Sequence, residues 1–177
     1  MNKLCMILPL ALILCFMVGC QDKAAMAELE EFKAQAEVEE QNKALVMRAE
    51  EAWLKGDFEA AKKILSPDYV GHISGKDLSL EDMIEGLKMQ IAMFPDRTSS
   101  AEDIIAKGDK VIVRSITRAT YEGDVEGFPV TGSKIEVEGI EIVRVENGKI
   151  VESWASVDTL SLYQQLGMEL KPKEEEK

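Results

Sequence analysis

The chain has 177 residues, a formal net charge of −12 at pH 7, one histidine and three cysteines. An acidic chain without a basic stretch repels phosphate backbones, so we expect no nucleic-acid partner. A zinc site needs a cluster of Cys or His ligands, which this chain lacks, and neither a phosphate-binding glycine loop nor a nucleophile elbow occurs. We therefore expect no metal and no cofactor in the one domain that this length allows.

The N-terminus has the three zones of a secretory signal. Lys3 supplies a positive charge, residues 4–18 form an apolar run, and the small residue Gly19 precedes Cys20. The run is short for a spanning helix, which needs about 20 apolar residues. The ending Met17-Val18-Gly19-Cys20 resembles the lipobox of bacterial lipoproteins.

The lipobox resemblance implies a signal peptide over residues 1–19, lipidation of Cys20 and a location in the cell envelope. The other cysteines, Cys5 and Cys15, lie inside the segment that would be removed, so no disulfide can form in the mature chain. Gln21 stands where aspartate would favour inner-membrane retention, which implies the periplasmic face of the outer membrane if the cell is Gram-negative.

Residues 20–43 are predicted to form the lipidated cysteine and a helical spacer. This stretch is rich in Ala, Glu and Lys and has no Gly or Pro, so it favours a helix. Its apolar stripe is thin (Leu29, Phe32 and Ala36), which favours a spacer over a coiled coil, because a coiled coil needs sustained heptads.

A single domain is predicted over residues 44–167, followed by a charged, disordered tail over residues 168–177. The first part of the domain indicates three helices. One faces a core from Ala44 to about Gly56, a second follows the cap residue Asp57, and a third begins at Ser79 and ends before Phe94-Pro95.

After Asp96 the apolar period changes to that of strands. Segments 101–106, 110–121, 134–145 and 149–157 are rich in Val, Ile and Thr, with tight-turn signals between them. A last helix is predicted from Thr159 to Leu166. Helices followed by a meander of antiparallel strands indicate an α+β fold. Arg114 and Arg144 are expected to pair across the sheet with Glu141 or Glu138.

An ordered set of short phrases resembles a known family, the SnoaL-like "ester cyclase" group of the nuclear-transport-factor-2-like superfamily. The resemblance covers about residues 44–167. The phrases are Ser66-Pro67-Asp68-Tyr69-Val70 with His72, Phe94-Pro95-Asp96, residues 105–111 with Arg114, Thr120 with Gly123, Pro129, Thr131-Gly132, residues 145–150, Trp154 with Asp158, and Gln165-Leu166-Gly167.

The resemblance implies a cystatin-like α+β barrel, in which a cone-shaped, curved antiparallel sheet packs on three N-terminal helices and encloses one pocket. It also implies a small hydrophobic ligand, a homodimer formed through the sheet, and cofactor-free cyclase or isomerase chemistry. In that chemistry a carboxylate removes a proton alpha to a carbonyl.

Two departures from the family pattern leave open whether the chain is an enzyme. The family's Thr-His-x-Gly is Thr120-Tyr121-Glu122-Gly123 here, and its Trp-Asp pair is Trp154-Ala155. The alternative is a non-catalytic small-molecule-binding or protein-interaction module tethered to the membrane.

Asp158 is the first candidate for a general acid or base. Strand alternation places Trp154, Ser156 and Asp158 on one face, which the resemblance implies lines the pocket, and an apolar pocket would favour the protonated carboxyl. The other interpretation is equally open: Asp158 precedes Thr159-Leu160-Ser161 and can cap the last helix.

Four further side chains are assigned to the predicted pocket. His72 could relay a proton or simply hold a structural hydrogen bond. Tyr121 could assist Asp158 by donating to a substrate oxygen, and Tyr69 could line the pocket, although core packing is an alternative for both. Trp154 is expected to form a pocket wall.

Overall fold

The computed structural model describes the backbone of residues 7–123, 132–169 and 171, and the side chains of these ranges from residue 23 onward. The chain divides into two units, Met1–Val38 and Glu39–Lys177. The described residues of the first unit belong to α1 (Ile7–Lys55), and their role as a spacer stays a prediction. The Cys20 side chain and most of the charged tail lie outside the described residues. Within the described part of the chain, no helix is long and apolar enough to cross a membrane.

The second unit contains the remaining helices and all the described strands. After the end of α1 they follow as α2 (Phe58–Ile64), β1 (Leu65–Ile73), β2 (Lys76–Ser79), α3 (Leu80–Met93), β3 (Thr98–Lys107), β4 (Lys110–Thr120), β5 (Lys134–Glu146), β6 (Lys149–Val157) and α4 (Thr159–Gln165). The predicted order of three helices, a strand meander and a final helix is confirmed. The meander places polar and apolar side chains alternately on its two faces.

The strands form one six-stranded sheet in the order β2-β1-β6-β5-β4-β3. Neighbouring strands are antiparallel except β1 and β6, which run parallel. A parallel pair requires a long crossover, and here α3 and the whole meander separate the two strands. The antiparallel prediction is therefore wrong for this one pair, because alternation along a strand does not reveal its partner.

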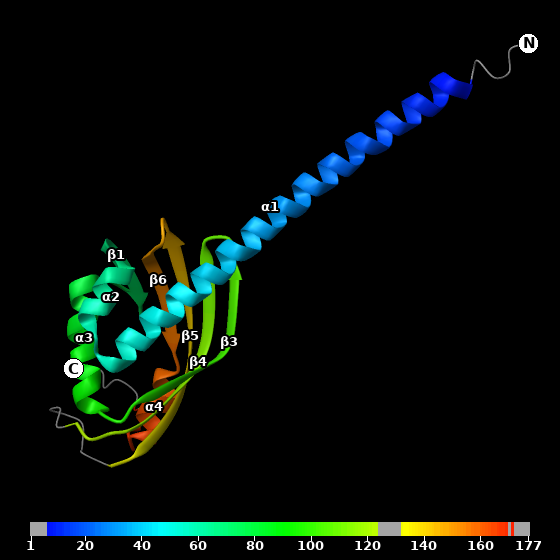
Figure 1. Cartoon of the computed structure of the whole chain (residues 1–177). Helices are drawn as coiled ribbons and strands as arrows, with labels where there is room; N and C mark the ends of the chain where they lie inside the picture. Colours follow the sequence, from blue (N-terminus) through cyan, green and yellow to red (C-terminus); the bar gives the residue numbers. More distant parts are fainter. Residues whose placement is uncertain (1–6, 124–131, 170, 172–177) are drawn as a thin grey trace, which may run out of the picture. The chain divides into compact units, whose positions relative to one another are not determined.

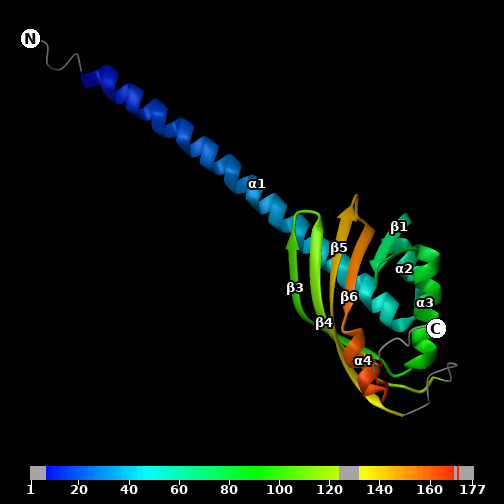
Figure 2. The ribbon, with the colours of Figure 1, turned by 180° about the vertical axis from the view of Figure 1, so that it is seen from behind.

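The helices of this unit cover one face of the sheet. Figures 1 and 2, which view the ribbon from opposite sides, show the C-terminal part of α1 crossing that face beside α2 and α3. Leu45, Val46, Ala49 and Ala52 recur at helical spacing on α1 and are buried. Register shifts in the β1–β6, β3–β4 and β5–β6 pairs add local bends, which help the sheet curve around the helices.

The hydrophobic core consists of two separate clusters of buried side chains. The larger one joins α1 and α3 to the strands through Val111, Val143 and Ile150. The smaller one lies around Tyr121 and contains Ala119, Ile135, Val137 and Leu166. The candidate site lies between these clusters, on the inward-facing residues of β4 and β5.

Candidate functional site: a carboxyl pair inside the domain

Glu141 lies on the core-facing side of β5. Val137 and Val143, two positions with the same alternation phase, are 5% and 2% exposed, whereas Glu138 projects to the outer face. Its cross-strand partners are Val113 on β4 and Ala155 on β6. A carboxyl group on the core side of a sheet is rare unless another group partners it.

The partner of Glu141 is a second carboxyl, that of Glu50 on α1. The two side chains are hydrogen-bonded to each other. Two carboxylates have no proton to share, so this bond requires that at least one of the groups is protonated. Burial is the largest influence on both: it raises the pKa of Glu50, and burial together with the Glu50 charge raises the pKa of Glu141 to about 8. The pair therefore holds a proton near neutral pH.

Two hydroxyls extend this arrangement across β6 to β1. The Tyr69 hydroxyl lies 2.7 Å from Ser153 Oγ, and Ser153 in turn hydrogen-bonds Glu141. Tyr69 and Ser153 are only 4% and 1% exposed. Burial raises the pKa of Tyr69 to about 12, so its hydroxyl keeps its proton at physiological pH.

Arg97 supplies a positive charge that acts on Glu50. Its Nη2 donates to the Trp53 carbonyl oxygen at 2.5 Å, and its Nη1 lies 3.4 Å from Gln90 Oε1. Its Nε is buried and has no hydrogen-bond partner among the described residues. The guanidinium charge acts to lower the pKa of Glu50, opposing the effect of burial, and it leaves Glu141 without a comparable counter-charge.

Residues around the pair are less buried than those of the two clusters on either side. On the inner face of the sheet, Ser115, Gly139, Glu141 and Ala155 keep intermediate exposure, although buried residues flank them on β4 and β5. Glu50 also keeps part of its surface accessible. The polar pair thus lies between the two apolar clusters and not inside either of them.

Asp158 lies elsewhere, at the start of α4. It is exposed, and its side chain accepts a hydrogen bond from Ser161 N at 2.9 Å. The capping interpretation is confirmed by this contact. The acid–base interpretation stays a prediction.

A direct prediction follows for Asp158. Asparagine caps a helix nearly as well as aspartate, so Asp158→Asn should leave the free energy of unfolding nearly unchanged, whereas Asp158→Ala should lower it by about 0.5–2 kcal/mol. Urea denaturation of the three proteins measures the difference. Equal stability of the alanine variant and the parent would contradict a contribution of the cap.

His72 and Trp154 lie together, with their rings stacked at 5.2 Å and 15°. Because Ser153 is buried against the helices, its neighbour Trp154 lies on the opposite, outer face. The expected inward face of Trp154, Ser156 and Asp158 is therefore wrong by one residue, and Ala155 takes the inward position. The role of Trp154 as a ligand wall stays a prediction without support from its position.

His72 is held in an ionic network on that outer face. Its Nδ1 lies 2.7 Å from Asp77 Oδ1 and its Nε2 lies 2.9 Å from Glu152 Oε1. These hydrogen bonds raise the pKa of the imidazole, and the bond that Glu152 accepts has the largest influence. Arg144 Nε also donates to Glu152, at 2.8 Å. The structural alternative for His72 accounts for these contacts.

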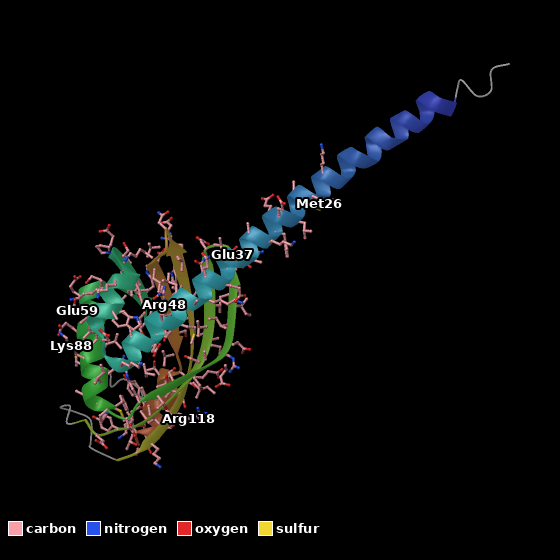
Figure 3. The ribbon with its side chains drawn as sticks, viewed as in Figure 1. Met26, Glu37, Arg48, Glu59, Lys88 and Arg118 are labelled. Carbon is pink, nitrogen blue, oxygen red and sulfur yellow. The ribbon has the colours of Figure 1, made fainter. Side chains whose placement is uncertain are left out.

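Other charged side chains of the sheet form ion pairs on the outside of the domain. Arg114 donates to Glu138 at 2.8 Å, which confirms one of the expected cross-strand pairs. Arg118, labelled in Figure 3, donates to Glu136 at 2.8 Å. Glu141, the other expected partner, faces inward and joins Glu50 instead.

Tyr121 is 1% exposed and packs 5.5 Å from the Phe94 ring in the smaller cluster. The structure therefore brings Tyr69 to the carboxyl pair, but places Tyr121 in a different cluster and Asp158 at a helix cap.

The prediction missed Glu50 and Glu141. The available signal was the phase of β5, in which Glu141 follows Val137 and precedes Val143 at two-residue spacing. Among the described residues, no group of three or more His, Cys, Asp or Glu side chains could hold a metal.

A curved sheet with helices on one face and a carboxyl pair between them defines an α+β cone fold with a polar site inside it. The sequence model of the SnoaL-like polyketide cyclase family matches residues 43–166, so the chain belongs to this family. The predicted family and fold are thereby confirmed. No curated protein matches the chain.

Solved structures of similar proteins support the same assignment. AclR, a candidate hydroxylase from Streptomyces galilaeus, is 29% identical with a TM-score of 0.67, and the match covers 73% of this chain and 97% of AclR. IdmH, a candidate polyketide cyclase from Streptomyces antibioticus, is 30% identical with a TM-score of 0.66 over 72% of this chain and 99% of IdmH. A candidate polyketide cyclase from Acidithiobacillus ferrooxidans is 27% identical with a TM-score of 0.62, over 72% and 94% of the two chains.

Proposed function

We propose that the chain is a cofactor-free cyclase or isomerase that acts on a carbonyl compound through the Glu50–Glu141 pair. The observation that carries this proposal is the hydrogen bond between two desolvated carboxyls inside the domain, with a pKa of about 8 for Glu141. General acid–base catalysis needs groups that exchange protons near the working pH. Desolvation and a neighbouring like charge are the usual means of bringing a carboxyl into that range.

A pair that shares one proton can supply both halves of an enolisation. The ionised carboxylate removes the proton alpha to the carbonyl, and the electron pair of that C–H bond forms the carbon–carbon double bond of the enol. The protonated carboxyl gives its proton to the carbonyl oxygen, so charge does not accumulate on the substrate. In an isomerase the enol is reprotonated at another carbon. In a cyclase its carbon attacks a second carbonyl carbon of the same molecule, whose oxygen then takes up a proton.

The proposed ligand pocket is the region between the two core clusters. Desolvation dominates the behaviour of both carboxyls, yet Glu50 and Glu141 retain accessible surface. Groups that are far from bulk water and still accessible are those that line an internal hollow. Ser115, Gly139 and Ala155 share that intermediate exposure on the neighbouring strands. A small hydrophobic molecule with one carbonyl directed at the pair suits such a lining.

This proposal moves the acid–base role from Asp158 to Glu141. The family pattern carries an aspartate directly after the tryptophan, at the position of Ala155. Glu141 is the cross-strand partner of Ala155, so it supplies a carboxyl on the same inward face. The loss of one carboxylate along β6 is thus accompanied by the presence of another on β5.

Hydrogen–deuterium exchange in 2-tetralone tests the proposal without knowledge of the natural substrate. This neutral aromatic ketone has acidic protons alpha to its carbonyl, and their loss in D2O is followed by ¹H NMR. The purified full-length protein should accelerate the exchange above the rate in buffer and above that with the denatured protein. Binding of 2-tetralone without accelerated exchange would favour the alternative, a non-catalytic binding module.

We further propose that the domain is tethered to the membrane of the cell envelope through lipidated Cys20. The charged start, the apolar run and the sequence Met17-Val18-Gly19-Cys20 support this assignment. When the chain is expressed in a bacterium fed a radiolabelled fatty acid, it should take up label and fractionate with membranes. Cys20→Ser should lose both properties; label in that variant would contradict the anchor.

A homodimer through the outer face of the sheet is a related proposal. Ile105, Ile112, Ile142 and Trp154 are successive cross-strand partners, and Ile105 and Ile112 are 58% and 37% exposed. Such an apolar row on a sheet face is typical of an interface. Sedimentation equilibrium should give twice the monomer mass, and Ile112→Glu should give the monomer. A monomeric parent protein would contradict the proposal.

A further inference from the structure

We infer that Glu39 and Asn42 are positioning residues for the carboxyl pair, because they fix α1 to the turn between β3 and β4. This role rests on the proposed function, since it concerns how Glu50 is placed opposite Glu141. Neither positioning side chain is assigned a contact with the substrate. Both belong to the second unit of the chain, which begins at Glu39.

The two side chains of α1 hold both backbone polar groups of Gly108 in that turn. The Gly108 N–H donates to Glu39 Oε1 at 2.9 Å, and the Gly108 carbonyl oxygen accepts from Asn42 Nδ2 at 3.1 Å. Asn42 is 9% exposed and the side chain of Glu39 is 17% exposed, so these bonds are largely shielded from water. Such shielding strengthens a hydrogen bond. We call Glu39, Asn42 and Gly108 the clamp.

One residue further along, the same turn is also fixed to β5. The Val145 N–H donates to the Asp109 carbonyl oxygen at 2.8 Å. Val145 is buried in the larger core cluster, and a register shift of the β5–β6 pair lies directly before it. Residues 107–109 therefore join α1 to β5, which are the two elements that carry Glu50 and Glu141.

The two carboxyls lie at similar distances from this turn. Glu50 follows Asn42 by eight residues. A helix rises 1.5 Å per residue, so that separation is about 12 Å along α1. Glu141 precedes Val145 by four residues. A strand rises about 3.3 Å per residue, so that separation is about 13 Å along β5. Both paths lead away from the turn, and the two carboxyls meet at their ends.

Apolar packing by itself would fix the position of α1 less closely than the clamp does. Ala49 and Ala52 bury the helix against the domain, but hydrophobic burial has no preferred direction and these side chains are small. The hydrogen bonds of the clamp, in contrast, weaken as their length and angle change. Gly108 has a φ of +62°, which glycine adopts without strain, so the turn can keep this shape. A sliding α1 would break the clamp and carry Glu50 away from its partner.

The double variant Glu39→Ala/Asn42→Ala removes both side-chain partners of Gly108 and tests the role. Its rate of 2-tetralone exchange should fall about 10- to 100-fold, since a misplacement of about 1 Å can cost about 100-fold. The carboxyl of Glu141 should titrate below its parent pKa of about 8 in ¹³C NMR, because a displaced Glu50 raises that pKa less. Glu39→Gln keeps an acceptor for the Gly108 N–H and should match the parent protein in both measurements.

The matched control is Asp57→Ala, which removes the cap of α2 and leaves the clamp intact. The lost cap lowers the stability of the protein, but the exchange rate and the Glu141 titration should stay at their parent values. A general loss of stability is thereby separated from a loss of position. Exchange of the Gly108 N–H with solvent should be slow in the parent protein and fast in the double variant, which shows directly that the clamp is open.

The possible results separate the inference from the proposed function. A folded double variant with an open clamp, the parent exchange rate and the parent Glu141 titration overturns the inference and leaves the proposed function standing. If the double variant does not fold, Glu39→Ala alone should show the same changes to a smaller extent, and their absence also overturns the inference. A parent protein that does not accelerate 2-tetralone exchange overturns the proposed function, and the Glu141 titration then decides the inference by itself.

Discussion

Glutamine in place of Glu141 should lower the rate of 2-tetralone exchange by about 10²- to 10⁴-fold, the usual contribution of a positioned acid or base. Glutamine has the shape of the protonated glutamic acid, can accept from Ser153 and can donate its amide to Glu50. These two contacts are thereby preserved, while the transferable proton is lost. The exchange rate of the folded variant, compared with that of the parent protein at pH 7, measures the effect.

The matched control is Glu138→Gln, which makes the same change three residues away on the outer face of β5. Glu138 pairs with Arg114 and is well exposed, so its loss should leave the exchange rate within about twofold of the parent rate. Glu50→Gln should be as damaging as Glu141→Gln, because it removes the other carboxyl of the pair. An active Glu141→Gln protein would mean that the interior pair does not carry the reaction.

The free energy of unfolding should depend on pH through Glu141, and Glu141→Gln should remove that part of the dependence. The folded pKa of Glu141, about 8, lies above its ordinary value of 4.5, so between these pH values the folded chain binds more protons than the unfolded chain. The stabilisation is therefore fully present below pH 4.5 and is lost as the pH rises to about 8. One such group gives a slope of at most about 1.4 kcal/mol per pH unit in the free energy of unfolding.

Glu141→Gln has no proton to lose at this position, so its stability should vary less between pH 5 and 9 (roughly the interval spanned by the two pKa values) and should exceed that of the parent protein at the alkaline end. The pKa values of Glu50 and His72 are also raised, so both groups add stability at lower pH, but both remain in the variant. Asp82, Asp96 and Glu152 have lowered pKa values, so the stability that they contribute is lost only at more acidic pH. Urea denaturation across this range measures the effect. Parallel curves for parent and variant would contradict a protonated Glu141.

The fold was largely predictable because local patterns decide it. Alternation and turn signals place the meander, and the cap residues Asp57 and Ser79 do begin α2 and α3. The parallel pairing of β1 with β6 was not predictable, because it depends on which edge the chain reaches after α3 and on no local sequence feature. The phrases shared with the family identified the correct fold without revealing this pairing.

The site was predicted less well than the fold, because the sequence does not show which face of each strand is buried. Alternation puts Trp154 and Ser156 on one face, but nothing along β6 says which face is buried. Ser153 decides that question, and a serine carries no hydrophobic signal of burial. Glu141 was likewise assigned to an arginine on the outer face, because charged residues usually pair on the surface. Only the tertiary packing of α1 shows that Glu50 lies against it.

A buried carboxyl pair is a costly feature of a small domain. Desolvation disfavours each charge, and the expected gain in alkaline stability of Glu141→Gln is the measure of that cost. Natural proteins keep such groups mainly where function requires them. Ser153, which acts on Glu141, is itself held by a 2.7 Å contact with Tyr69 on the neighbouring strand β1, so the polar surroundings of the pair are tied to the sheet.

The most direct test of the interior pair is the titration of the Glu141 carboxyl by ¹³C NMR in the full-length protein. Glutamate labelled at its side-chain carboxyl gives one signal per residue, and the signals that disappear in Glu141→Gln and Glu50→Gln assign the two carboxyls. The structure predicts that the Glu141 signal titrates near pH 8, far above the ordinary range, and that its titration is linked to that of Glu50. Titration of both carboxyls near pH 4.5, the ordinary value for glutamate, would contradict the shared proton and the acid–base function built on it.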